Sequence, residues 1–119
     1  MATLLPFLRV PDVAFAIAWY EGIGFRCLGT HQEPGCETDW ALMDWDGAQF
    51  MLYSLLPGTL QQANNCGLYF KMKNIAGLPE KLEGKAHIFE MIAETEYGRK
   101  EITFHDCYDF QVTFSSEPD

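Results

Sequence analysis

Basic residues are scarce in this chain. Its 119 residues include eight Lys or Arg against 17 Asp or Glu, which gives a formal charge of −9. Nucleic acids and anionic membrane surfaces are bound through basic patches, so this balance argues against both as partners. An excess of acidic groups permits a cationic ligand, although it also serves ordinary solubility.

Closely paired cysteines and long apolar runs are also missing, and we expect no leader segment. The cysteines Cys27, Cys36, Cys66 and Cys107 are scattered and form no CxxC pair, whereas structural zinc sites use closely spaced ligands. No charged segment precedes an apolar run at the N-terminus, and no apolar stretch approaches membrane-spanning length. We therefore expect a cytoplasmic protein with reduced thiols and no membrane partner.

What the chain does have is an internal repeat. Phe7-Leu8-Arg9-Val10 is echoed by Tyr69-Phe70-Lys71-Met72, and Gln49–Leu52 is echoed by Gln111–Phe114, at a spacing of about 62 residues. Each copy predicts the order strand–helix–strand–strand–strand. We expect one domain, 1–119, made of module 1 (about 1–56) and module 2 (about 64–117).

The expected fold class is α+β, with two βαβββ modules forming a curled mixed sheet around a cavity and the helices on the outer face. The expected strands are Thr3–Val10, Phe25–Glu33, Asp39–Asp44, Ala48–Ser54, Gly67–Lys73, Lys85–Glu94, Arg99–His105 and Phe110–Ser115. One helix should follow Asp12 and stop near Gly22 or Gly24, and a second, weaker one should cover Ile75–Leu82. Leu55–Asn65 reads as a connector.

Alternation in these strands separates an apolar face from a mixed one. The face expected to pack on the helices carries Leu4, Pro6, Leu8, Val10, Phe50, Leu52, Leu68, Phe70, Met72, Ile102, Phe104, Phe110, Val112 and Phe114. The opposite face carries aromatic, Met and polar side chains, which is typical of a ligand cavity. A solvent-facing sheet or an interface would give the same pattern. Trp40 is ambiguous, because the repeat aligns it with helix-facing Ile102 and a one-residue slip would turn it to the cavity.

Several motifs resemble a known family. Leu5–Asp12 (LPFLRVPD), Trp19-Tyr20-Glu21 and Gly24-Phe25 in module 1, with Tyr97–Glu101 and His105-Asp106 in module 2, resemble the vicinal oxygen chelate superfamily. This superfamily contains glyoxalase I, extradiol dioxygenases, fosfomycin-resistance enzymes and bleomycin-resistance proteins. The resemblance covers essentially the whole chain.

The resemblance implies four metal positions, which fall on Leu5, Met51, Gly67 and Thr113. None of these offers the imidazole, carboxylate or thiolate that a divalent cation requires. We expect His31, His87 and His105 to be solvated or hydrogen-bonded rather than metal-bound. The sequence therefore indicates the metal-free branch similar to bleomycin-resistance proteins, with no metal and no cofactor. The last turn departs from the family's Asp-Pro-Asp-Gly-Asn, and Asp109 must take a positive φ if the turn is kept.

The function we expect is metal-free binding and sequestration of a cationic or aromatic small molecule, as in antibiotic resistance, by a homodimer. The expected ligand-binding residues are Leu5, Phe7, Arg9, Gln49, Met51, Tyr53, Tyr69, Lys71, Glu101, Gln111 and Thr113. No residue is assigned as catalytic. The alternative is an enzyme of lyase, isomerase or oxygenase type with an unknown substrate, for which Glu101 and His105 are the acid–base candidates. A third possibility is a dimeric interaction module whose cavity is vestigial.

Overall fold

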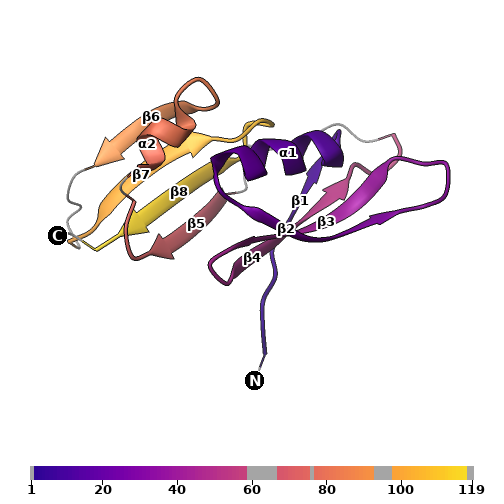
Figure 1. The fold of residues 1–119 in the computed structure, drawn as a ribbon, viewed down its shortest axis with the longest axis horizontal. Coiled ribbons are helices and arrows are strands. Elements are labelled where there is room, and N and C mark those ends of the chain that lie inside the picture. Colours follow the sequence, from indigo (N-terminus) through magenta and orange to yellow (C-terminus); the bar gives the residue numbers. More distant parts are fainter. Residues whose placement is uncertain (1, 59–66, 76, 93–97, 118–119) are drawn as a thin grey trace. The chain divides into compact units, whose positions relative to one another are not determined.

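The chain forms two units with the same order of elements. The computed structural model describes residues 2–58, 67–75, 77–92 and 98–117. The units are residues 1–61 and 62–119. Each runs strand–helix–strand–strand–strand, so the predicted α+β class with two βαβββ modules is confirmed (Figure 1).

Each unit contains one mixed four-stranded sheet. The elements of the first unit are β1 (Phe7–Val10), α1 (Val13–Ile23), β2 (Arg26–Gln32), β3 (Thr38–Trp45) and β4 (Ala48–Ser54). The elements of the second are β5 (Gly67–Met72), α2 (Leu78–Leu82), β6 (His87–Ile92), β7 (Lys100–His105) and β8 (Gln111–Ser116). The strand orders β1-β4-β3-β2 and β5-β8-β7-β6 are equivalent, and in each sheet the first pair is parallel and the others are antiparallel.

Helix α1 has a defined signal at both ends. The Asp12 carboxylate accepts a hydrogen bond from the backbone N–H of Phe15 at 3.0 Å, which satisfies one of the free donors of the first turn. Gly24 ends the helix with φ of 118°, a conformation that glycine adopts without strain. The buried face of α1 brings Tyr20 against the rings of Phe25 and Phe50, with centroid distances of 5.1 and 5.0 Å.

Two predicted boundaries are wrong by three residues or more, whereas the other described boundaries differ by at most two residues. The first strand begins at Phe7 rather than Thr3, and Leu4 and Pro6 are exposed instead of joining the apolar face. The Pro6 carbonyl still accepts from the N–H of Met51, but proline has no N–H with which to extend the ladder. Helix α2 begins at Leu78 rather than Ile75, next to Pro79, whose fixed φ suits a first helical turn.

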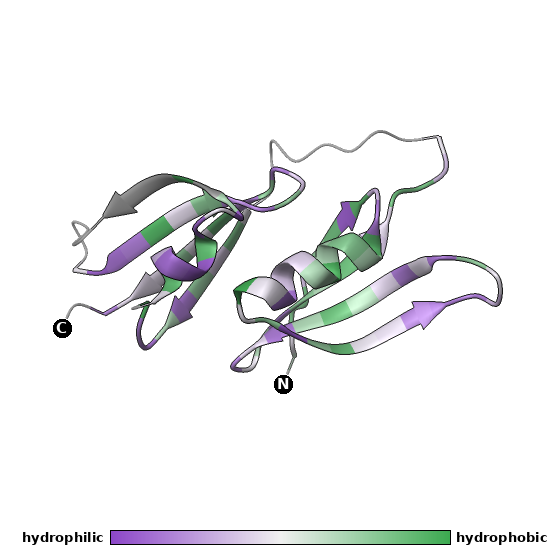
Figure 2. Ribbon diagram, turned by 45° about the horizontal axis from the view of Figure 1, so that its top comes forward, coloured by the Kyte–Doolittle hydropathy of each residue, from purple (hydrophilic) through white to green (hydrophobic). Residues whose placement is uncertain are grey.

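Apart from Leu4, Pro6 and the half-buried Met72, the predicted apolar face is buried. The fully or almost fully buried members of the predicted set are Leu8, Val10, Phe50, Leu52, Leu68, Phe70, Ile102, Phe104, Phe110, Val112 and Phe114. Hydrophobic segments run along α1 and along the strands of each sheet (Figure 2). Among the described residues no helix is long and apolar enough to span a membrane.

The repeat is not uniform in its spacing. Leu52 and Phe114 are 62 positions apart, but their pairing partners Ala41 and Ile102 are only 61 apart. The turn between β3 and β4 has two residues, 46–47, whereas the turn between β7 and β8 has five, 106–110. Strand pairing therefore makes Trp40 equivalent to Glu101 rather than to Ile102.

Candidate functional site

One row of side chains crosses the sheet of the first unit on the face turned away from α1. Arg9 of β1 pairs with Tyr53 of β4, Tyr53 pairs with Trp40 of β3, and Trp40 pairs with His31 of β2. Their neighbours Ala41 and Leu52 are buried in the core, so alternation turns the row outward. Every strand of the sheet thus contributes one side chain to this row.

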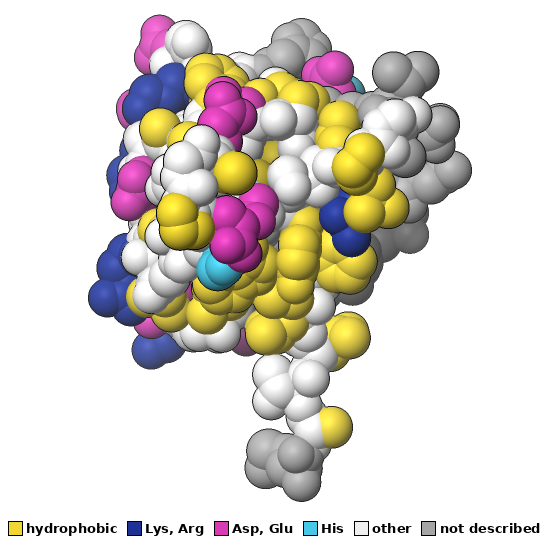
Figure 3. Space-filling model, turned by 90° about the vertical axis from the view of Figure 1, so that its right-hand side faces the viewer, with side chains coloured by type: hydrophobic (Ala, Val, Ile, Leu, Met, Phe, Trp, Pro, Cys, Tyr) yellow, Lys and Arg dark blue, Asp and Glu magenta, His cyan; other side chains and the backbone are white. Residues whose placement is uncertain are grey.

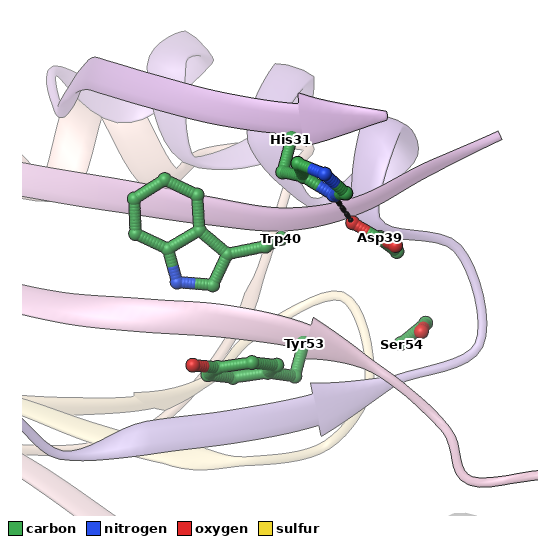
Figure 4. A pocket seen from close by; sticks show the side chains of 5 residues that line it. All are labelled: His31, Asp39, Trp40, Tyr53 and Ser54. Carbon is green, nitrogen blue, oxygen red and sulfur yellow. Dashed lines mark hydrogen bonds and ion pairs between the residues drawn. The ribbon is translucent and has the colours of Figure 1, made fainter. Parts of the chain in front are cut away.

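A hollow lies over part of this row. It is lined by His31, Asp39, Trp40, Tyr53 and Ser54 and has a volume of about 410 Å³. That volume falls in the range of small-molecule sites, which combine aromatic walls with a few polar groups. Figure 4 shows Trp40 and Tyr53 projecting from adjacent strands, with His31 and Asp39 together at one end. In the space-filling view, hydrophobic side chains gather beside a histidine and acidic groups (Figure 3).

The Trp40 indole packs against Gly29, which has no side chain. A Cβ at Gly29 would lie 3.6 Å from Cζ3 and 3.8 Å from Cη2 of Trp40. The six-membered ring therefore lies over the backbone of β2. Glycine at this position leaves room for the indole to lie along the sheet.

Arg9 and two rings form a cluster beside the hollow. The Arg9 Cζ lies 5.5 Å from the ring centroid of Phe7 and 5.3 Å from that of Tyr53, within the range of cation–π contacts. The two rings meet edge to face at 5.2 Å. The Arg9 Nη1 donates to the carbonyl of Ser54 at 2.9 Å. The guanidinium is thus held against the aromatic surface.

His31 and Asp39 form a pair at the other end of the row. Their Nδ1 and Oδ1 atoms are 2.8 Å apart, and Glu33 Oε1 lies 3.5 Å from His31 Nε2. The hydrogen bond and the charge of Asp39, with a smaller contribution from Glu33, raise the pKa of His31 above its usual value of 6.5. We predicted a hydrogen-bonded or solvated His31 from the sequence, and its ring has both properties.

The equivalent face of the second unit has a different chemistry. The Tyr69 hydroxyl donates to the Glu101 carboxylate, which is buried, and the hydroxyls of Thr103 and Thr113 are 3.0 Å apart. Arg99 Nη2 donates to the carbonyl of Ser115 at 3.1 Å. This face is polar where that of the first unit is aromatic.

Glu101 and His105 do not form an acid–base pair. Both lie on β7, four residues apart, and a strand advances about 3.3 Å per residue, so their backbones are separated by roughly 13 Å. Two groups that share a proton must come within hydrogen-bond reach of the same atom. Cys107 is no better candidate for chemistry, because burial and the neighbouring Asp106 raise the pKa of its thiol to about 12.

The residues at the four implied metal positions do not fit a metal. Leu5 and Met51 offer no oxygen or nitrogen ligand in their side chains, Gly67 has no side chain, and the Thr113 hydroxyl is bonded to Thr103. Among the described residues, no group of three His, Cys, Asp or Glu side chains is placed to hold a metal ion.

The predicted ligand-binding residues divide between the two units. Phe7, Arg9, Met51 and Tyr53 lie together on the outward face of the first sheet, and Gln49 bonds to Asp44 at the end of the same sheet. The predicted residues in the second unit are Tyr69, Lys71, Glu101, Gln111 and Thr113. Cys66 and the His87 side chain lie outside the described part.

The sequence prediction missed His31, Asp39 and Ser54 as lining residues. It also left Trp40 undecided. Strand register was the signal that could have placed Trp40 and His31, because both follow from pairing with Tyr53.

Comparison with known proteins decides the fold. No protein-family model and no curated protein sequence matches this chain. A bleomycin-binding protein complexed with bleomycin superposes with a TM-score of 0.72 at 14% identity, covering 98% of this chain and 99% of its own. The chain has the bleomycin-resistance fold.

Other structures with this fold have different names. TioX from Micromonospora sp. ML1 is similar, with a TM-score of 0.78, 18% identity and coverage of 99% of this chain and 98% of its own. A glyoxalase-family protein from Bacillus cereus also has a TM-score of 0.78, with 15% identity and coverage of 100% and 95%. At these identities the likeness establishes the bleomycin-resistance fold and no particular activity.

Proposed function

We propose that this chain is a small-molecule binding protein of the vicinal oxygen chelate superfamily, in its metal-free branch, and that it sequesters an aromatic ligand. The observation that carries the proposal is the hollow over Trp40 and Tyr53, with Arg9 and Phe7 beside it. Aromatic side chains with a few polar groups are what a flat ligand needs for packing and orientation.

The fold supports this proposal as an analogy. One structure with this fold is a bleomycin-binding protein in complex with bleomycin. The side chains at the four metal positions of this chain cannot serve as a ligand set, which favours binding over metal-assisted catalysis. The enzyme alternative gains no support from Glu101 and His105, which are too far apart to act on one proton.

We further propose a cytoplasmic homodimer. The cysteines that the structure describes, Cys27, Cys36 and Cys107, form no disulfide, which suits a reducing compartment. Closed pairs are the commonest assembly of small soluble chains, and Phe15 and Leu28 expose about half of their side-chain surface. The sequence prediction of a cationic ligand rests on the net charge, on the resemblance to bleomycin-resistance proteins and on Glu101 as a possible partner for the cation.

The test is a titration of ¹⁵N-labelled protein with two probes, bleomycin and neutral 2-naphthalenemethanol. The chain has three tryptophans, Trp19, Trp40 and Trp45, and each gives one indole N–H resonance. Assignment uses Trp40→Phe and the matched control Trp19→Phe. We expect a saturable shift of the Trp40 resonance with at least one probe, since Trp40 lines the hollow.

Trp45 serves as an internal control, because its half-buried ring packs on the buried ring of Phe25 at 5.1 Å and does not line the hollow. The proposal fails if neither probe moves the Trp40 resonance at millimolar concentration. Zinc or manganese retained stoichiometrically after dialysis would instead support the enzyme alternative.

A further inference from the structure

The environment of Arg9 indicates the sign of the charge that a ligand of the first unit would carry. In a chain with 17 acidic and eight basic residues, an arginine normally finds a carboxylate nearby. Arg26, the other arginine of the first unit, lies 3.3 Å from the Asp44 carboxylate. Arg9 has no carboxylate partner in the part of the chain that the structure describes.

The contacts of Arg9 fix its orientation and leave donors available. One N–H of Nη1 bonds to the Ser54 carbonyl, and the guanidinium lies against the rings of Phe7 and Tyr53. A guanidinium carries five N–H donors in one plane and matches a carboxylate through two parallel hydrogen bonds. Arg9 is partly buried, which strengthens such a bond relative to one in open water.

Arg9 is also within reach of a ligand in the hollow. It contacts Tyr53 and bonds to Ser54, and both of these residues line the hollow. Trp40 lies two strands away in the same row, which is about 10 Å at a strand spacing of roughly 4.8 Å. A planar ring system with an acid group at one end spans such a distance.

We propose that the first unit recognises an aromatic acid. The ring packs on Trp40 and Tyr53, and the carboxylate takes two N–H donors of Arg9. This inference rests on the proposed function and adds the ligand class to it. An anionic ligand replaces the cationic ligand that the net charge suggested. The charged side chain at the edge of the hollow is the Arg9 guanidinium, and this cation attracts an anion.

The acidic groups of the row do not offer an equivalent site for a cation. Asp39 is hydrogen-bonded to His31, and Glu33 lies beside the same imidazole. When the imidazole is protonated, its positive charge partly neutralises the two carboxylates. The Glu33 carboxylate is also largely exposed and that of Asp39 is partly exposed, so water screens their attraction for a further cation.

The experiment compares three probes with the same ring: 2-naphthoate, 2-naphthalenemethanol and 2-naphthylmethylammonium. Dissociation constants are measured at pH 7.5 from the Trp40 indole resonance of the full chain. We expect 2-naphthoate to bind about tenfold more tightly than the alcohol, which is the size of effect a charge-assisted hydrogen bond gives, and the ammonium to bind most weakly. Equal binding of all three, tightest binding of the ammonium, or no binding of 2-naphthoate would overturn the inference.

Two variants of Arg9 locate the effect. Arg9→Met should abolish the preference for 2-naphthoate over the alcohol, and Arg9→Lys should retain only part of it, since an ammonium lacks the planar fork. Lys73→Met is the matched control, because it removes one positive charge from an exposed position after β5. A preference that survives Arg9→Met, or that Lys73→Met removes equally, would assign it to net charge and contradict a site at Arg9.

These outcomes separate the two proposals. If the alcohol shifts the Trp40 resonance and 2-naphthoate binds no better, the small-molecule function stands and the acid class is wrong. If no probe, bleomycin included, moves that resonance, both proposals fail.

Discussion

At the scale of single residues, Gly29 determines how Trp40 lies. Its φ angle is not in the left-handed region, so the backbone there would accept a side chain. What glycine provides is space, because a Cβ would already be in van der Waals contact with the indole. The aromatic wall of the hollow thus depends on a residue that does not line it.

We predict that Gly29→Leu displaces the indole and weakens binding of the naphthalene probes by about tenfold, the equivalent of one well-placed aromatic contact. Gly29→Ala is the control, because a contact at 3.6 Å is an ordinary one and should leave both the indole resonance and the affinity close to those of the wild type. A Leu variant that binds like the Ala variant would contradict the role of Gly29.

His31 gives a prediction about pH. Asp39 raises the pKa of His31, so the folded protein holds the proton on His31 more tightly than the unfolded chain does. Its contribution to stability is therefore fully present below about pH 6.5, the unfolded value, and is lost as the pH rises through the folded pKa.

An NMR titration of the imidazole checks this shift. We expect a midpoint above 6.5 in the wild type, a return toward 6.5 in Asp39→Asn, and a smaller change in Glu33→Gln, because Glu33 is the minor cause. A midpoint that Asp39→Asn leaves unchanged would show that Asp39 is not the cause.

At the scale of elements, the two hairpins show what the sequence could predict. The Asp46-Gly47 turn was expected from its dipeptide, and both residues have positive φ, 50° and 92°. Asp109 was expected to need a positive φ and has 68°. The 106–110 turn between β7 and β8 is stabilised by Asp106, whose carboxylate accepts hydrogen bonds from the N–H groups of Tyr108 and Phe110 at 2.8 and 2.9 Å.

We predict that Asp109→Gly stabilises the protein by about 0.5–1 kcal/mol, since glycine adopts the left-handed region without steric cost. Asp109→Val should destabilise it by about 1–2 kcal/mol, because a β-branched residue is poorly tolerated there. Urea unfolding curves give both values. An Asp109→Val variant as stable as the wild type would mean that the turn rearranges.

The polar face of β7 and β8 gives a second test of an element. Thr103 and Thr113 are both buried and their hydroxyls are bonded to each other. Thr113→Val should cost about 1–3 kcal/mol by leaving the Thr103 hydroxyl without this partner, whereas changing both residues to Val should cost much less than twice that. A double-mutant cycle in urea measures the coupling, and additive effects would show that the two hydroxyls act separately.

At the scale of the whole molecule, the order of elements was predictable and half of the site was not. Alternation and the repeat gave every helix and strand, because both report a buried face. Trp40 was left undecided because face assignment needs the strand register, and a fixed repeat spacing applied across turns of different length gives the wrong register. His31 was missed because the sequence pattern did not reveal its pairing with Trp40. Asp39 lies at the register shift between the His31–Trp40 and Gln32–Thr38 pairs, and Ser54 is the last residue of β4. Strict alternation of faces predicts neither as a lining residue.

We also predict a homodimer. Light scattering at micromolar concentration should give twice the chain mass of 13.6 kDa. Phe15→Lys and Leu28→Lys each place a charge at an exposed apolar position. The variant whose position lies in the dimer interface should be monomeric, and the other should remain a dimer. A wild-type monomer at high concentration would contradict the prediction.

The unequal turns of the two hairpins have a consequence for chimeras. If segments were exchanged between the two modules by matching residues 62 positions apart, β7 would enter the recipient sheet one residue out of register. Ile102 would then take the outward position of Trp40, and Thr103 would enter the core at the position of Ala41. Crossovers placed in the turns, at 46–47 and 106–110, would keep each strand with its own phase. Recombination libraries of this fold should therefore be aligned by strand pairs rather than by residue count.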